Sequence, residues 1–281
     1  MALDGLNSGV VRPGVERPRL VRARVADPAR IAALVASEAW LASARVLKVE
    51  AGSSVVCGRV DGLGVVVKSR LLRGARERIG AAVGFSRGLR QWRGAELLRG
   101  AGLETADPLV LFRAVGAAGP VETLVMEELS GPTLVEVAAG PVGQGGGEGG
   151  VRLGGACGAL VGAMLRAGLR NRDLKASNVI VRPDGTLAQI DTVGVSRRAG
   201  GGGGGGSAEM LMRLVVECVG TGVTPRRSVM RAAVKAACAA TGEDPRGVWR
   251  EVRRRLIAHG DPTPKVNPLS GPVGAPGSVD Q

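Results

Sequence analysis

One stretch, "LRNRDLKASNVIVRPDGTLAQIDTVGV" (169–195), constrains the fold of this 281-residue chain more than any other. The runs "NVIV" and "LAQI" have the residue types of short strands and the turn "RPDG" separates them, which predicts a β-hairpin. A hairpin of this length brings Asp191, after the second strand, level with Asn178, at the start of the first. The sequence therefore predicts a cluster of polar side chains at one edge of the hairpin.

These polar side chains suit phosphoryl transfer. Asn178 and Asp191 offer hard oxygen ligands, and Mg²⁺ on nucleotide phosphates needs few protein oxygens because it keeps several waters. Asp173, a few residues upstream, is placed to orient or deprotonate a hydroxyl, and Lys175 to neutralise charge on the transferred group. We predict Asp173 and Lys175 as catalytic residues, Asn178 and Asp191 as metal ligands, and ATP with Mg²⁺ as cofactors.

The spacing D-x-x-x-x-N, followed by a strand-borne D-x-x-G, resembles the catalytic loop and metal-binding segment of protein kinases. "NRDLKASN" (171–178) matches closely, with Asn171 where the common pattern has His. "DTVG" stands where D-F-G is usual and is one residue longer, and no A-P-E motif follows. The alternative is a surface hairpin that holds these residues without function.

The first half of the chain reads as β-rich. Asp27-Pro28 predicts the start of a helix that runs to about Ser43. Three antiparallel strands follow from Arg45 ("RVLKVE", "SVVCGRV", "GVVVKS"), then a helix over 86–100 and two strand-like runs, "PLVLFRA" and "VETLVMEEL". We expect residues 1–26 to form a flexible arm and 27–139 to form one lobe.

The second half reads as mainly helical. A glycine-rich linker (140–150) precedes a helix over 151–167, and the hairpin and a glycine run (200–206) follow. Three helices are expected near 207–219, 226–240 and 245–258. We expect a second lobe over 151–260 and a disordered tail over 261–281. The predicted fold is therefore α+β: a two-lobed protein-kinase-like fold with an antiparallel β-rich N-lobe and a reduced, mainly helical C-lobe.

Upstream residues fall in the order that a kinase-like fold requires. Lys68 ends the third strand, where such a fold has the lysine that pairs with nucleotide phosphates. Glu96, on the following helix, is the natural carboxylate partner for Lys68. Gln91 occupies a competing position earlier on that helix and supplies no charge.

Two further segments would contact the nucleotide. The phosphate-covering loop is "EAGSSVV", with Gly52, Ser53 and Ser54 between two strands, and it is poor in glycine. "LVMEEL" (124–129) has the position of the hinge, whose backbone from Glu127 to Leu129 would receive adenine.

Taken over about residues 39 to 195, the pattern resembles the lipopolysaccharide-core kinases that act on Kdo or heptose. The resemblance rests on "AWLASARVLKVEAGSSVVCGRVDGLGVVVK", "SRGLRQWRGAELLRGAGLETADPL", "LVMEELSGPTL" and "NRDLKASNVIV…AQIDTVGV". It implies ATP-dependent phosphorylation of an inner-core sugar at the cytoplasmic face of the membrane. Gln91 departs from it, because a glutamate is often found there, and the C-terminal part has no motif that matches.

Composition narrows the classes of partner. Lys and Arg number 38 against 25 acidic residues, a formal charge of +13, which favours an anionic sugar or lipid-linked sugar acceptor but equally fits solvated basic faces. Aromatic residues are 2% and tyrosine is absent, which disfavours a nucleic-acid binder. One histidine and four dispersed cysteines exclude an H-E-x-x-H zinc site and argue against a disulfide framework.

Two other functions remain open: a small RIO-like Ser/Thr protein kinase, and a pseudokinase or nucleotide-binding scaffold. The expected location is the cytoplasm, because no run of about 18 apolar residues and no signal peptide is found. The basic amphipathic segment "DPRGVWREVRRRLIAHG" (244–260) offers peripheral contact with an anionic membrane. The alternative is that its apolar face packs on the protein core.

Overall fold

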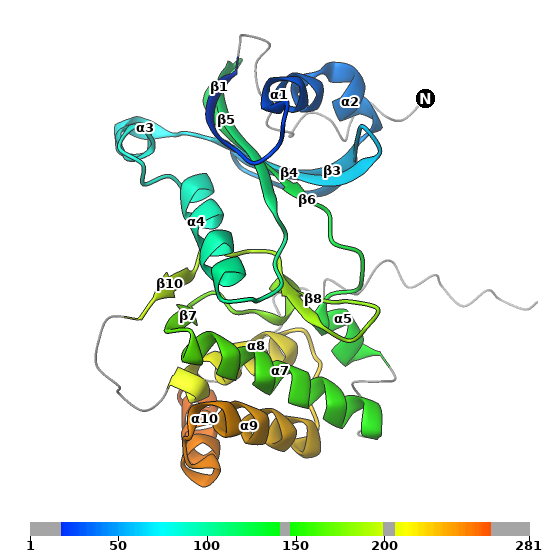
Figure 1. Cartoon of the computed structure of the whole chain (residues 1–281), viewed down its shortest axis with the longest axis vertical. Helices are drawn as coiled ribbons and strands as arrows, with labels where there is room; N and C mark the ends of the chain where they lie inside the picture. Colours follow the sequence, from blue (N-terminus) through cyan, green and yellow to red (C-terminus); the bar gives the residue numbers. More distant parts are fainter. Residues whose placement is uncertain (1–17, 141–146, 199–205, 260–281) are drawn as a thin grey trace, which may run out of the picture. The chain divides into compact units, whose positions relative to one another are not determined.

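The computed structural model describes residues 18–140, 147–198 and 206–259 (Figure 1). The described chain divides into two compact units. The first holds the residues up to Gly100, Thr105–Ser130 and Ile190–Val195, and the second holds Ala101–Glu104, Gly131–Gln189 and the residues from Ser196 onward. Most of the expected arm, most of the glycine linker, the glycine run before 206 and the expected tail lie outside the described residues.

The first unit is built on a six-stranded antiparallel sheet with the strand order β1-β5-β6-β4-β3-β2. The sequence pattern predicts five of its strands. The strands are β1 (Arg19–Ala23), β2 (Arg45–Glu50), β3 (Ser53–Val60), β4 (Leu63–Leu71), β5 (Pro108–Gly116) and β6 (Gly119–Glu127).

Strand β1 corrects the expectation of a flexible arm over 1–26. Arg19–Ala23 pairs antiparallel with β5, and Leu20 lies opposite Phe112. The exposed edge of β5 offers unpaired backbone groups, which a short segment satisfies whatever its side chains. Five residues with two arginines carry too little alternation for the sequence pattern to show this strand.

In the described part of this unit, four helices accompany the sheet: α1 (Pro28–Ala36), α2 (Glu38–Ser43), α3 (Gly74–Ala82) and α4 (Arg87–Gly100). The single helix expected to Ser43 is two helices, because Ser37 is extended. Ser37 ends α1, and its Oγ accepts from the Trp40 amide at 3.3 Å to cap α2. The sequence pattern predicts α4 but not α3.

Both faces of the sheet are covered (Figure 1). Helices α1 and α2 pack Val35 and Trp40 against one face, together with Phe112 of β5. Helix α4 packs Leu89 and Trp92 in a second cluster with Leu111, the neighbour of Phe112 along the strand. Successive strand residues point to opposite faces, so β5 contributes to both cores.

The second unit is mainly helical. Its helices are α5 (Leu134–Ala139), α7 (Glu148–Arg166), α8 (Gly206–Gly220), α9 (Arg227–Thr241) and α10 (Pro245–His259). Its short elements are β7 (Leu169–Asn171), the 3₁₀ turn η1 (Ala176–Asn178), β8 (Val179–Val181), β9 (Leu187–Gln189) and β10 (Val195–Arg197), with β7 paired to β10 and β8 to β9. The sequence pattern predicts the hairpin and the four long helices, but not α5, β7 and β10.

Glycines on α7 explain how a glycine-rich segment forms a long helix here. Gly154, Gly158 and Gly162 recur every four residues, so they form one stripe, and this stripe faces α9. A methyl group at Gly158 would overlap the backbone carbonyl of Ala233 on α9, and one at Gly154 would overlap that of Val229. The two helices therefore pack at backbone distance, and this contact offsets the low helix propensity of glycine.

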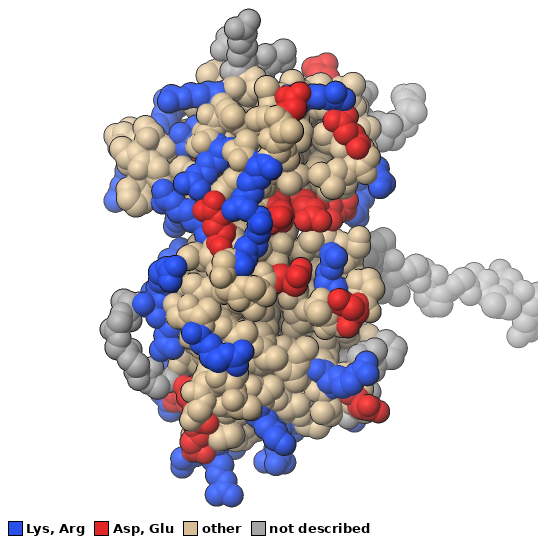
Figure 2. All heavy atoms as spheres, viewed as in Figure 1, with Lys and Arg blue, Asp and Glu red and all other residues tan. Residues whose placement is uncertain are grey.

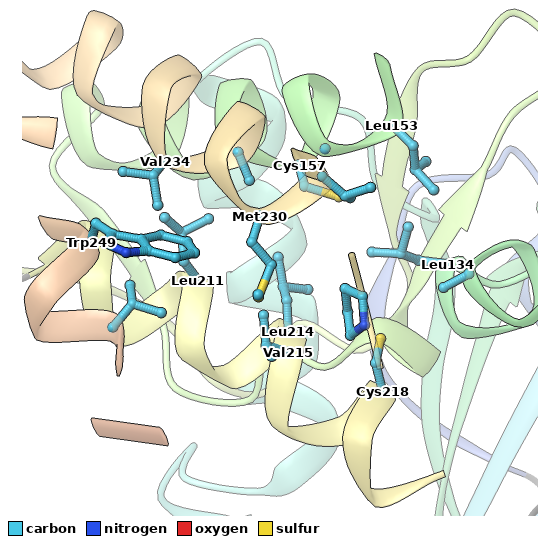
Figure 3. Close-up of a pocket in the computed structure, with 16 residues that line it drawn as sticks. Leu134, Leu153, Cys157, Leu211, Leu214, Val215, Cys218, Met230, Val234 and Trp249 are labelled. Atoms are coloured by element: carbon cyan, nitrogen blue, oxygen red, sulfur yellow. The ribbon is translucent and has the colours of Figure 1, made fainter. Parts of the chain in front are cut away.

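The interior between α7, α8, α9 and α10 is apolar and leaves a cavity of about 70 Å³. Figure 3 shows Leu211, Leu214 and Met230 converging there from α8 and α9. Burial raises the pKa of Cys157 to about 12 and that of Cys218 to about 12, so both thiols stay neutral at physiological pH. Across the described helices, none has the length and apolar content needed to cross a bilayer.

The glycine stripe yields a prediction with an internal control. We expect Gly158→Ala to destabilise the fold by about 1–3 kcal/mol, because its methyl group must displace α9. Gly155 lies on the same helix, and a methyl group there would have no atom within 4 Å, so we expect Gly155→Ala to be neutral or to stabilise by up to about 1 kcal/mol. Urea unfolding monitored by circular dichroism measures both, and equal midpoints for the two variants would contradict the packing described.

Candidate active site

The loop that carries Asp173 is anchored in the second unit by a buried polar pair. Asn171, at the end of β7, is 1% exposed. Its Oδ1 accepts from the Asp173 amide at 2.9 Å and its Nδ2 donates to Gln189 Oε1 at 2.8 Å. Gln189 lies at the end of β9 and also donates to Met164 Sδ of α7 at 3.2 Å. Asn171, which replaces the usual histidine, therefore ties the loop to the hairpin and to α7.

Three of the predicted residues share one tight turn. The Asp173 carbonyl accepts from the Lys175 amide at 2.9 Å and from Asn178 Nδ2 at 3.2 Å. Because Asn178 donates through its nitrogen, its Oδ1 remains directed as an acceptor, which fits a hard cation. The Asp173 side chain is 45% exposed, and its Oδ2 lies 3.9 Å from Arg172 Nε. Lys175 is also exposed.

An acidic residue far along the chain holds this turn in place. Glu217 of α8 accepts from both the amide and the hydroxyl of Ser177, each at 2.6 Å. Leu174 and Ala176 are fully buried on either side of Lys175. Sequence reasoning misses Glu217, because nothing in the pattern of α8 signals a partner 40 positions upstream. Glu217 and these two buried side chains therefore hold the backbone of the turn, and the Lys175 side chain between them is exposed.

The predicted hairpin is confirmed in its register. Val179 lies opposite Gln189, and Val181 lies opposite Leu187. The paired strands therefore begin one residue after Asn178 and end two residues before Asp191. The Gly131–Thr133 segment lines the other edge of β8, where Thr133 bridges to Ile180.

Asp191 belongs to the first unit, where Ile190–Val195 packs against α4. Its Oδ1 accepts from the Val193 amide at 3.3 Å, and Arg87 Nη2 lies 3.6 Å from its other oxygen. Thr192 is fully buried and donates from Oγ1 to the Gln91 carbonyl at 2.6 Å. In "DTVG", Thr192 is thus the residue that locks the segment onto the helix.

Lys68 lies beside this segment. Its Nζ donates to the Ile190 carbonyl at 3.4 Å, and Gln91 Nε2 donates to the same oxygen at 3.1 Å. Burial lowers the pKa of Lys68 below its usual value, the negative charge of Asp191 opposes that shift, and Arg87 adds to it. The carboxylate whose charge acts on Lys68 is therefore Asp191, within the same unit.

The expected Lys68–Glu96 pair is wrong. Glu96 accepts instead from Arg22 at 3.2 Å, from Arg24 at 3.1 Å and from Trp92 Nε1 at 2.9 Å. Glu96 lies five positions after Gln91, which turns it about 140° around the helix and towards Arg22 of β1. Burial alone would raise the pKa of Glu96, but the hydrogen bonds from Trp92 and Arg24 and the two arginine charges lower it.

The expected phosphate-covering loop is a tight turn between β2 and β3. Gly52 has a φ of +77°, which favours glycine, and the Arg73 guanidinium lies where a methyl group would be. Ser53 and Ser54 are the first residues of β3. Ser54 is only 3% exposed, so Ser53 is the serine with surface to offer a phosphate.

The expected hinge is already partly engaged in backbone hydrogen bonds. The Glu127 amide donates to the Asp107 carbonyl at 2.8 Å, and the Glu128 amide donates to the Gly64 carbonyl at 2.9 Å. An adenine that docks on this segment would therefore use the Leu129 amide or a carbonyl group. Leu129 also packs on the apolar cluster beneath α4.

Because Glu96 pairs with arginines and not with Lys68, we expect substitutions of Lys68 and Glu96 to have different effects. We expect Lys68→Met to abolish ATP-dependent activity while leaving thermal stability unchanged or higher, because it removes a buried charge. Glu96→Gln should change the KM for ATP less than about twofold and lower the melting temperature, because two arginines lose their carboxylate. A Glu96→Gln variant with the catalytic defect of Lys68→Met would instead support a functional Lys68–Glu96 pair.

A second prediction tests the lock on Asp191. A methyl group at Gly94 would overlap the Thr192 carbonyl, whereas Gly100 at the end of the same helix has nothing within 4 Å. We expect Gly94→Ala to displace Ile190–Val193, with loss of Mg²⁺-dependent nucleotide binding and of stability by about 1–3 kcal/mol. Calorimetric titration with ATP measures the effect, and Gly100→Ala should match the wild type. Unimpaired binding by Gly94→Ala would refute the lock.

Comparison with known proteins identifies the fold. No protein-family model and no curated protein matches the chain. A solved structure of WaaP in complex with acyl carrier protein is similar, with 18% identity and a TM-score of 0.56 over 85% of this chain and 99% of the WaaP chain. This likeness confirms the expected α+β, kinase-like fold and agrees with the resemblance to lipopolysaccharide-core kinases.

Proposed function

We propose that the protein is an ATP-dependent kinase that transfers the γ-phosphoryl group to a hydroxyl of a lipopolysaccharide-core sugar, Kdo or heptose. The observation that carries this proposal is the turn around Asp173. There, Asp173, Lys175 and Asn178 project from a backbone held by Asn171 and Glu217. A rigidly supported base, cation and amide oxygen at this spacing suit phosphoryl transfer, which depends mostly on positioning and charge.

In the proposed reaction the sugar hydroxyl oxygen forms a bond to the γ-phosphorus, and the bond from that phosphorus to the bridging oxygen breaks to release ADP. The Asp173 carboxylate accepts the hydroxyl proton. Lys175 neutralises charge on the transferred group, and Lys68 binds the phosphates of ATP. Asn178 and Asp191 would hold Mg²⁺, which supplies charge neutralisation on the phosphates.

The sugar acceptor is supported by likeness and by charge. The sequence from about residue 39 to 195 resembles lipopolysaccharide-core kinases, and the net charge of +13 suits an anionic, lipid-linked acceptor at the cytoplasmic face of the membrane. Since the WaaP structure is a complex with acyl carrier protein, that protein is a candidate partner as well. The competing functions are a RIO-like protein kinase and a nucleotide-binding scaffold.

Labelled ATP distinguishes these functions. The protein is incubated with γ-labelled ATP and, separately, with a lipopolysaccharide-core fraction and a protein fraction. We expect label in the glycolipid. Label confined to protein would favour the RIO-like kinase, and nucleotide binding without Mg²⁺-dependent turnover would favour the scaffold.

The proposed base is tested by a matched pair of aspartates. We expect Asp173→Ala to lower kcat about 10²–10⁴-fold with little change in ATP affinity, as for loss of a general base. Asp184 lies in the turn of the same hairpin, where its carboxylate accepts from the amide and hydroxyl of Thr186, so Asp184→Ala should keep near wild-type turnover. An Asp173→Ala enzyme as active as Asp184→Ala would overturn the assigned role.

A further inference from the structure

A groove of about 1050 Å³ lies between α9, α10 and the first turn of α7, away from every residue assigned above. Its lining includes the apolar side chains of Val151, Val234 and Trp249. Ligand sites in proteins commonly enclose about 300–1000 Å³, so this groove has room for a sizeable molecule. Figure 2 shows basic side chains projecting at the end of the second unit where α9 and α10 lie.

The walls of the groove carry five cations and one carboxylate. Two rows of basic residues face it: Arg227, Arg231 and Lys235 on α9, and Arg246 and Arg250 on α10. Within each row the spacing is four residues, which stacks like charges on one helix face. Such an arrangement costs stability unless an anion lies between the charges. Both rows border the same concave surface, so their charges add.

The ion pairs of the described residues leave these five cations out. Among the residues that the structure describes, no ion pair joins any of them to an acidic group. Further along α10, by contrast, Arg254 and Arg255 both pair with Glu251, at 2.6 and 2.7 Å. Arg254 and Arg255 therefore share a carboxylate partner, whereas the five groove cations form no ion pair with an acidic residue among the described residues.

The carboxylate of the groove, Asp244, is engaged in capping α10. It accepts from the Arg246 and Gly247 amides at 3.1 and 2.8 Å and so caps α10. Those hydrogen bonds, from Gly247 first, and the nearby arginine charges lower the pKa of Asp244. Asp244 thus serves the helix end, and the Ser228 hydroxyl adds a neutral donor to the same wall.

We propose that this groove binds a ligand with two or more phosphate groups. Two arginine rows offer planar donor pairs, the geometry that phosphate oxygens accept best. The apolar lining residues, Trp249 among them, would contact the non-phosphate part of the ligand. This inference does not rest on the proposed kinase activity, since no groove residue belongs to the catalytic loop or to the Lys68 region.

The phosphates have two sources, a soluble phosphorylated polyol or a lipid headgroup, and separate probes distinguish them. Inositol hexakisphosphate serves as the soluble probe, followed by calorimetry. Vesicles of cardiolipin, a lipid that carries two phosphates, mixed with phosphatidylcholine serve as the lipid probe, followed by co-sedimentation, with pure phosphatidylcholine as reference. Binding of either probe through the groove supports the proposal, and the probe that binds shows whether the phosphates belong to a soluble molecule or to a lipid headgroup.

The groove variant is Arg231→Gln with Arg250→Gln, and its control is Arg76→Gln with Arg93→Gln, which removes the same charge from exposed residues of the first unit. All four residues are exposed, so both variants should fold, which circular dichroism verifies. We expect the groove variant to bind at least about tenfold more weakly and the control to bind within about twofold of the wild type.

Three results would overturn the proposal. Equal weakening in both double variants would mean that binding is a diffuse effect of net charge. Absence of binding by the wild type to either phosphate probe would remove the site. Groove-dependent binding of purified acyl carrier protein, with neither phosphate probe bound, would make this a protein-docking surface instead.

Discussion

The Ile190 carbonyl oxygen is the point on which the first unit's part of the candidate site depends. Lys68 from the sheet and Gln91 from α4 both donate to it. The approach of Thr192 that Gly94 permits, with the hydrogen bond from Thr192 to the Gln91 carbonyl, is the second contact that holds the Asp191 segment to α4. Gln91 is neutral and brings no charge to this place, and Asp191 is the carboxylate whose charge acts on Lys68.

In the second unit, the loop of Asp173 is held by a hydrogen bond between two other residues, Asn171 and Gln189. Asn171 and Gln189 are buried, and their hydrogen bond joins the loop of Asp173 to the end of β9. Gln189 and Ile190 are consecutive, and the chain passes from one unit to the other between them. Each unit therefore fixes its own functional residues by a hydrogen bond made within two residues of Asp191. A substitution at either anchor should act on the chemistry more than on global stability.

Much of this fold is predictable where the pattern is local. The β8–β9 hairpin, α4 and α7 follow from turn residues and apolar spacing over ten to twenty positions. The role expected of Glu96 is wrong because its partners, Arg22 and Arg24, come from a strand and its flank that have no pattern of their own. The support of Ser177 by Glu217 escapes prediction for a related reason, since only the folded chain brings the two together.

The central claim is that Asp191 takes part in holding a metal–nucleotide complex. The most direct measurement is the affinity for ATP with and without Mg²⁺, in the wild type and in Asp191→Asn. We predict that the wild type binds ATP more tightly when Mg²⁺ is present, and that Asp191→Asn loses most of this increase in affinity. The same gain in both proteins, or no gain in the wild type, would contradict it.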